Sequence, residues 1–148
     1  MAKTNRSEEA RRWFRQAQHD VRAAQWNLEG GFYDTVCFLS QQAAEKALKS
    51  AHYFLGTSRR TLLTHSVVAL LRKATTGIPG LADCLEGGRE LDLHYVPSRY
   101  PNGLPSGYPH QFYGREMAEK AIAAAQRILS AIELFYGERG VEWPRDDE

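Results

Sequence analysis

The sequence has few of the features that mark membrane or secreted proteins. No stretch approaches the roughly 18 consecutive apolar residues that a membrane-spanning helix needs, and the N-terminus is too polar and charged for a signal peptide. Its two cysteines, Cys37 and Cys84, are too few for a disulfide framework and do not form a CxxC pair. We therefore expect a chain without a membrane span, located in the cytoplasm, with Cys37 as a buried free thiol.

An excess of charge of one sign is also missing. The 19 Lys and Arg nearly balance the 18 Asp and Glu, so the formal net charge is only +1. This balance argues against a general polyanion binder, although it allows one small basic pocket. The five histidines show no ligand spacing such as HxxxH, and there is no glycine-rich phosphate loop. We expect neither a metal site nor a cofactor.

What the chain does contain is helical periodicity, because apolar residues recur every three or four positions. Ser7 is the expected cap of the first helix, which ends at Gly30-Gly31, and Thr64 is the expected cap of the third, which runs to residue 73. The remaining helices are expected at 34–54, at 81 to about 95, where Gly87-Gly88 weakens the pattern, and at about 115–136.

No segment alternates as a β-strand does. The chain is therefore predicted to be all-α: an up-and-down antiparallel bundle of four to five helices. It forms a single domain over 1–148, with a core at about 7–137 and a charged C-terminal tail at 138–148. A long loop precedes the last helix, and residues 97–109 contain four of the six prolines. Because prolines restrict φ, such a loop can hold one shape, and long loops of this kind are often functional.

The strongest candidate for a functional site lies on the second predicted helix. Gln42, Lys46 and Lys49 are spaced at i, i+4 and i+7, so they share one stripe, and Glu45 lies four residues before Lys49. This stripe could be a solvated face with one ion pair worth ~0.3–0.5 kcal/mol. Alternatively, it faces a groove in which the lysines meet phosphate and the glutamines bond a base or sugar.

A second candidate is the segment from Tyr95 to Pro101, in which Arg99 is flanked by Tyr95 and Tyr100 and stiffened by prolines. A stiffened arginine can present its planar fork to a phosphate, and tyrosines can stack on a base. The alternative is a loop anchored by tyrosine packing, with Arg99 paired to an acid such as Glu45 or Asp20.

Taken together and in order, these residues resemble the HEPN family (higher eukaryotes and prokaryotes nucleotide-binding). The resemblance covers about residues 10–136, and its most specific pieces are the run around Gln42 and Lys49 and the later Arg99-Tyr100-Pro101. It implies a helical bundle that commonly dimerises and binds nucleotides. It also implies partnership with a minimal nucleotidyltransferase in two-protein toxin–antitoxin systems.

Many HEPN relatives are ribonucleases that use an arginine and a histidine four to six residues later, near the start of the last helix. Arg99 is at the corresponding place, but the next histidine, His110, is eleven positions on. Arg60 and His65 have the spacing, yet they lie between the second and third helices, where we interpret His65 as a capping or packing residue. The ribonuclease motif is therefore absent at its expected position.

We therefore predict a binding module, a homodimer that pairs with a minimal nucleotidyltransferase and takes a nucleotide or an RNA phosphate. The alternatives are a metal-independent ribonuclease toxin that uses Arg99 with His110 or His65, and a purely structural partner. The predicted ligand-binding residues are Gln42, Glu45, Lys46, Lys49, Arg99 and Tyr100.

Overall fold

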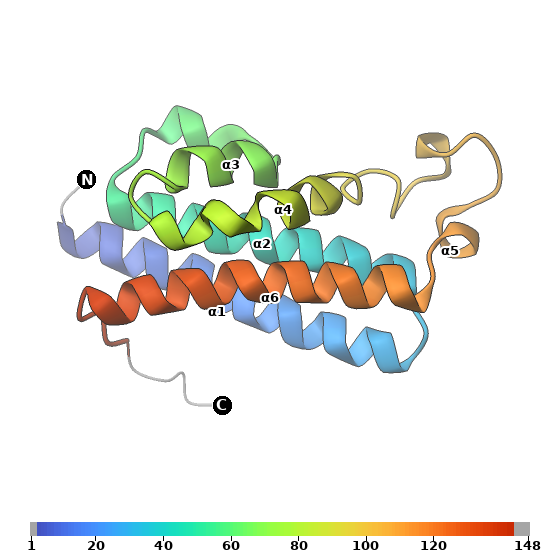
Figure 1. Cartoon of the computed structure of the whole chain (residues 1–148), viewed down its shortest axis with the longest axis horizontal. Helices are drawn as coiled ribbons and strands as arrows, with labels where there is room; N and C mark the ends of the chain where they lie inside the picture. The colour runs from blue at the N-terminus through green and yellow to red at the C-terminus, as the bar shows by residue number, and fades with distance from the viewer. Residues whose placement is uncertain (1–2, 144–148) are drawn as a thin grey trace.

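The computed structural model describes residues 3–143, and its regular structure is helical. Three long helices, α1 (Lys3–Glu29), α2 (Tyr33–Leu55) and α6 (Arg115–Glu138), run side by side (Figure 1). The shorter helices α3 (Val67–Ala74) and α4 (Leu85–Asp92) lie along one side of them. Within residues 3–143 there is no strand, and no helix combines the length and apolar character needed to cross a bilayer. The all-α prediction is confirmed.

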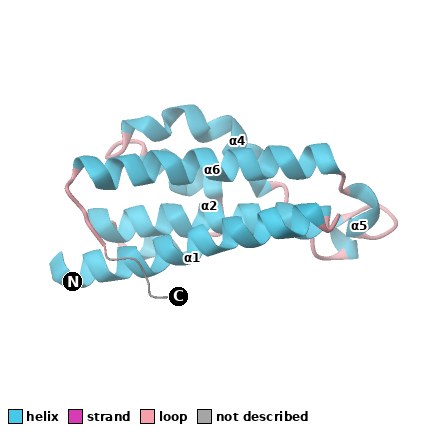
Figure 2. Ribbon diagram, turned by 90° about the horizontal axis from the view of Figure 1, so that it is seen from below, coloured by secondary structure: helices cyan, strands magenta, loops and turns pink. Residues whose placement is uncertain are grey.

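The helices follow the predicted up-and-down order. α1 and α2 form an antiparallel hairpin, and α3, α4 and the proline-rich segment return the chain to the end at which α6 begins (Figures 1 and 2). α6 therefore runs antiparallel to α1 and in the same direction as α2. The described residues hold six α-helices, one more than the upper number predicted. The addition is α5 (Pro109–Phe112), a single turn at the end of the proline-rich segment, and the short 3-10 turns are η1 (Arg59–Leu63), η2 (Pro79–Cys84) and η3 (Pro101–Gly103).

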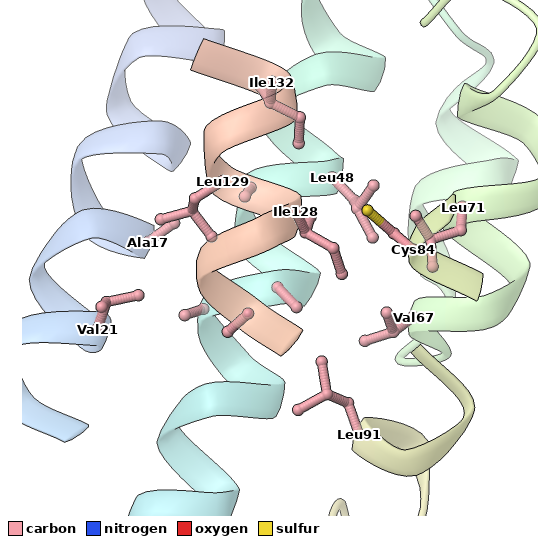
Figure 3. Close-up of a cluster of buried hydrophobic side chains, with 14 of the residues drawn as sticks. Ala17, Val21, Leu48, Val67, Leu71, Cys84, Leu91, Ile128, Leu129 and Ile132 are labelled. Atoms are coloured by element: carbon pink, nitrogen blue, oxygen red, sulfur yellow. The ribbon is translucent and has the colours of Figure 1, made fainter. Parts of the chain in front are cut away.

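The core lies between α2, α6 and the α3–α4 pair (Figure 3). The side chains that meet there are almost completely buried, each contributing roughly 1.5–3 kcal/mol relative to exposure. On the other side of α6, Leu129 faces Ala17 and Val21 of α1. The central buried side chains are Leu48, Val67, Leu71, Leu91, Ile128 and Ile132.

Two predicted capping residues have other partners. α1 begins at Lys3, before Ser7, and the Ser7 hydroxyl accepts a hydrogen bond from the Trp143 indole at 3.3 Å. The cap of α3 is Ser66, whose hydroxyl accepts the Ala69 N–H at 3.1 Å, whereas Thr64 accepts the Ser66 N–H. Both predictions placed a plausible hydroxyl a few residues from the true boundary.

Asp92, at the end of α4, completes the start of α3. Its carboxylate accepts the Ser66 hydroxyl at 2.8 Å and the backbone N–H groups of Val67 and Val68 at 2.6 and 3.1 Å. These are N–H groups that a helix cannot satisfy internally, and a carboxylate is favoured at this positive end. Asp92 thereby links α4 to the segment that carries His65.

The charged C-terminal segment takes part in packing at its start. Val141 and Trp143 pack against the core, and the Trp143 ring lies 4.8 Å from that of Tyr136. The predicted tail from residue 138 therefore contributes apolar contacts at least to residue 143, and residues 144–148 lie outside the described part.

Gly88 allows α3 and α4 to approach closely. A Cβ built on Gly88 would lie 2.5 Å from Leu71 Cδ1 and 3.3 Å from Val67 Cγ1. We expect Gly88→Ala to lower the free energy of unfolding by ~1–3 kcal/mol, because overpacking displaces core side chains. Urea denaturation measures this. Gly137→Ala on α6 is the control, because apart from its chain neighbours and its own helix backbone no atom lies within 4 Å of the added methyl, and it should be neutral or stabilising. Equal effects of the two substitutions would contradict the packing role of Gly88.

Two buried histidines predict a loss of stability in mild acid. His52 joins α2 to α3 through the Leu70 carbonyl at 3.0 Å, and burial lowers the pKa of both His52 and His94 below 6.5. As pH falls through about 6.5, the unfolded chain takes up protons that the folded chain does not, so folding weakens. In urea denaturation at about pH 7.5 and 5.5, the loss should shrink in His52→Gln and persist in the exposed control His19→Gln. An unchanged loss in His52→Gln would remove His52 as a cause.

Candidate functional site

The predicted stripe on α2 is only partly solvated. Glu45 and Lys49 are 4% and 8% exposed, and Gln42 and Lys46 are half-buried. The interpretation as a fully solvated face with one surface ion pair is therefore wrong. The partners of these side chains come largely from other segments of the chain, namely α1 and the segment before α3.

A buried carboxylate organises one part of this stripe. Glu45 Oε1 accepts Lys49 Nζ at 3.1 Å and contacts His65 Nδ1 at 2.7 Å, and Glu45 Oε2 accepts Gln42 Nε2 at 3.0 Å. We call Gln42, Glu45, Lys49 and His65 the Glu45 cluster. Gln41 links two members of this cluster, because its Nε2 donates to the His65 carbonyl at 3.0 Å and its Oε1 accepts from Gln42 Nε2 at 2.7 Å.

His65 is oriented but accessible. Its side chain is 59% exposed, and its ring stacks on Tyr95 at 4.8 Å with an interplanar angle of 19°. Since a carboxylate only accepts, the contact with Glu45 places a proton on Nδ1 and leaves Nε2 as the basic nitrogen of the neutral ring. The helix cap is supplied by Ser66, so His65 does not serve as the cap of α3.

Arg99 lies among aromatic rings. Its guanidinium carbon is 4.4 Å from the centroid of Phe38, 4.7 Å from that of Tyr95 and 4.9 Å from that of Tyr100. Its Nε donates to the Tyr95 carbonyl at 2.8 Å, which fixes the plane of the fork. We call these four residues the Arg99 cage.

The acids that sequence reasoning offered as alternative partners of Arg99 are engaged elsewhere. Glu45 bonds Lys49 and His65, and Asp20 bonds Lys46 Nζ at 2.6 Å and Gln16 at 2.9 Å. The structure therefore holds Arg99 through π faces, which leave its charge unneutralised by a carboxylate among these contacts.

The Glu45 cluster and the Arg99 cage form one connected surface. Tyr95 belongs to both, because it stacks on His65 and lies under Arg99. Phe38, one turn before Gln42 on α2, supplies the other wall of the cage. Positive charge, an amide and aromatic faces thus converge on one side of α2, an arrangement suited to a phosphate attached to a base or sugar.

Two of the predicted residues lie apart from this surface. Lys46 leans toward α1, where Asp20 holds it. His110, on α5, contacts Asp34 Oδ1 at 3.2 Å, one turn of α2 before Phe38, and is exposed. Of the predicted ligand residues, the structure brings together Gln42, Glu45, Lys49, Arg99 and Tyr100.

Gln41 and Tyr95 lie within the two candidate segments, but neither they nor Phe38 are among the predicted ligand residues, and His65 is predicted to cap or pack. A local signal existed for two of them: Phe38 precedes Gln42 by four residues on the same helical stripe, and Tyr95 precedes Arg99 by four. For His65 the decisive contact is with a residue 20 positions away, which no local spacing indicates.

The site offers no evident metal centre. Across residues 3–143, no group of three or more His, Cys, Asp or Glu side chains is placed to hold a metal ion. Cys37 is buried and unbridged, as predicted, and burial, with the charge of Asp34 adding, raises its pKa to about 12. Its thiol therefore stays protonated and unreactive at neutral pH.

Comparisons with known proteins agree with this architecture. A family model described as the HEPN domain matches residues 10–135. The crystal structure of TT1696 from Thermus thermophilus is 39% identical, with a TM-score of 0.79 over 85% of this chain and 97% of that chain. ST0689, an archaeal HEPN homologue, is 38% identical with a TM-score of 0.71, covering 86% of this chain and 97% of that one.

A more distant match is human sacsin, 26% identical over 129 residues, or 86% of this chain. The chain spans only 3% of the length of sacsin, so that likeness concerns one segment of a far larger protein. The HEPN model, by contrast, spans most of this chain, and the similar solved structures are matched over nearly their whole length. The chain belongs to the HEPN domain family.

Proposed function

We propose that the chain is a binding module for a nucleotide or an RNA phosphate, formed by the Glu45 cluster and the Arg99 cage. The observation that carries this proposal is the position of Arg99, clamped among three rings and connected through Tyr95 to His65 and Lys49. A planar guanidinium fixed in this way loses little entropy when it bonds two phosphate oxygens. Tyr100, 51% exposed, is available to stack on a base.

Calorimetric titration with ATP and a short RNA tests the proposal. Wild type should release or take up heat with a saturable curve, and Lys49→Ala should bind more weakly because one phosphate contact is gone. Since Lys49→Ala leaves Glu45 without its lysine, its thermal melt must show that it folds. The absence of saturable binding by wild type to both ligands would refute the proposed function.

The same proposal includes a homodimer and a minimal nucleotidyltransferase partner in a toxin–antitoxin-like pair within the cytoplasm. It is supported by membership of the HEPN family and by exposed apolar side chains at the end of the bundle where α5 and the start of α6 lie, namely Phe32, Tyr108, Phe112 and Met117. Analytical ultracentrifugation tests the dimer, and a monomer at every concentration would remove it. Co-purification with a nucleotidyltransferase encoded beside the chain's gene tests the partner.

One observation favours a second function, a metal-independent ribonuclease. The Glu45–His65 contact resembles the acid–histidine pairing of general-base sites, and the accessible His65 Nε2 can take the proton of a ribose 2′-hydroxyl as its oxygen attacks phosphorus and the 5′-oxygen leaves. Arg99 would steady the charge on phosphorus. A cleavage assay should then lose activity in His65→Ala and Arg99→Ala and keep it in His110→Ala; intact RNA after incubation with wild type would eliminate this function.

A further inference from the structure

A second surface, on the α1 side of α2, has a composition of its own. Two hollows of about 630 and 500 Å³ lie along α1 and α2 and share Glu9 and Tyr53 in their walls. Because they share these walls, the two hollows adjoin, and we call them together the arginine groove. Six cations line it: Arg6, Arg11, Arg12, Arg15, Lys46 and Arg59.

The charge of the arginine groove differs from that of the chain as a whole. The chain carries a formal net charge of +1, yet the groove gathers six of its 19 cations, and among the described residues Glu9 is the one acid in either wall. Glu9 bonds Arg12 at 2.6 Å, Glu8 lies 3.5 Å from Arg11, and Asp20 bonds Lys46 at 2.6 Å from beside the groove, so the six lining cations outnumber these three acids. A local excess of this kind in a nearly neutral protein attracts an anionic ligand to one place.

Aromatic rings accompany the cations. Trp13 and Tyr53 line the groove with their ring centroids 5.7 Å apart, and both are half-buried. Cations alternating with accessible rings are typical of surfaces that bind single-stranded nucleic acid, where the cations follow phosphates and the rings stack on bases. An acidic peptide would use the cations but would leave the rings without a role.

The groove is also long and joins the proposed site. From Arg6 to Gln16 it follows about 15 Å of α1 at ~1.5 Å per residue, which exceeds the reach of one nucleotide monophosphate. Lys49 of the Glu45 cluster lies 5.7 Å above the Trp13 ring, so the two surfaces meet at this contact.

We propose that the arginine groove binds a single-stranded oligonucleotide that continues from the Arg99 cage past Lys49 and Trp13. This inference rests on the proposed function for the start of the strand, and it names the ligand class as an oligonucleotide longer than one nucleotide. The arginines contact successive phosphates, and Trp13 and Tyr53 stack on bases.

The test uses the full chain and fluorescence anisotropy with a 12-nucleotide oligouridine, with calorimetry for ATP. The variant Arg12→Ala/Arg59→Ala removes one exposed cation from each hollow, and Arg72→Ala/Arg89→Ala removes two exposed arginines from α3 and α4 as a matched control. We expect the groove variant to bind the 12-mer at least ~10-fold more weakly, with the slope of log K against log salt reduced by ~1.4 for two lost contacts. Binding of ATP should stay unchanged in both variants.

A second variant examines the rings. Trp13→Leu keeps an apolar side chain at the same place, and it should weaken 12-mer binding by about 5- to 150-fold if a base stacks there. A 12-residue oligoglutamate peptide should bind more weakly than the 12-mer and be insensitive to Trp13→Leu. DNA and RNA 12-mers are compared in parallel: binding of both, or of RNA alone, supports the proposal.

Each failure has its own meaning. Groove and control variants that bind the 12-mer equally well would overturn the groove while leaving nucleotide binding at the Arg99 cage intact. A 12-mer bound by wild type and lost in the groove variant, with no ATP binding, would support the groove and remove mononucleotide binding at the Arg99 cage. Oligoglutamate bound as tightly as the 12-mer would overturn the oligonucleotide assignment, and no binding of any probe would overturn both proposals.

Discussion

Replacing Arg99 by lysine should weaken binding of ATP or a short RNA by about 10- to 100-fold, or ~1.4–2.7 kcal/mol. The substitution keeps the positive charge, so the loss of affinity measures the contribution of the planar guanidinium group. Arg99 presents a plane held against Phe38, Tyr95 and Tyr100, with Nε bonded to the Tyr95 carbonyl. A lysine has no plane to stack and no second donor set at a fixed angle, so it offers the phosphate a mobile point charge.

Arg115→Lys is the matched control for this measurement. Arg115 also lies over a ring, that of Tyr33 at 5.5 Å, but at the start of α6 and outside the Arg99 cage. Its conversion should leave affinity unchanged, and thermal melts should show both variants folded. If Arg99→Lys bound as tightly as wild type, the cage would be a packing device and the ligand would have to lie elsewhere.

The three long helices could be predicted because each buries one apolar stripe, and a stripe is visible in local spacing. α2 and α6 were predicted to within a few residues of their bounds. α4 was harder, since Gly87-Gly88 argues against a helix locally. Packing in the bundle explains the two glycines, because a Cβ built on Gly88 would lie 2.5 Å from Leu71 Cδ1 and one built on Gly87 would lie 3.0 Å from Ala124 Cβ. Tertiary packing outweighs the poor helix propensity of glycine here.

In the candidate site, too, the contacts within one helix could be predicted and the contacts between distant segments could not. The Glu45–Lys49 pair follows from i,i+4 spacing, and it was predicted. The stacking of His65 on Tyr95 agrees with the predicted packing role, but its contact with Glu45 could not be predicted, because the turn after α2 and the Asp92 bonds bring the two residues together. Lys46 was placed with Lys49, but Asp20 on α1, 26 residues away, draws it to the other side. Polar residues one turn apart on a helix can therefore belong to two different surfaces, and sequence spacing alone does not tell which residue belongs to which surface.

Glu45→Gln should lower the free energy of unfolding by about 2–4 kcal/mol, the largest loss expected from a change of so few atoms. Glutamine keeps the shape of the side chain but not the charge that holds Lys49 and His65. The Lys49 and Glu45 side chains are 10% and 5% exposed, so the ammonium group left behind has little water to replace its partner. Urea denaturation with an unchanged slope would report this loss as a lower midpoint.

The chain contains its own control, because Glu116 and Lys120 have the same order and spacing on α6 but are 88% and 66% exposed at 3.9 Å. Glu116→Gln should change stability by no more than ~0.5 kcal/mol. Glu45→Gln/Lys49→Met should recover part of the loss, since it removes the stranded charge as well. Recovery would show that the cost lies in an unpaired buried ammonium. If Glu45→Gln cost no more than Glu116→Gln, water would have to reach Lys49 freely, and the Glu45 cluster would be an open surface rather than a buried ion pair.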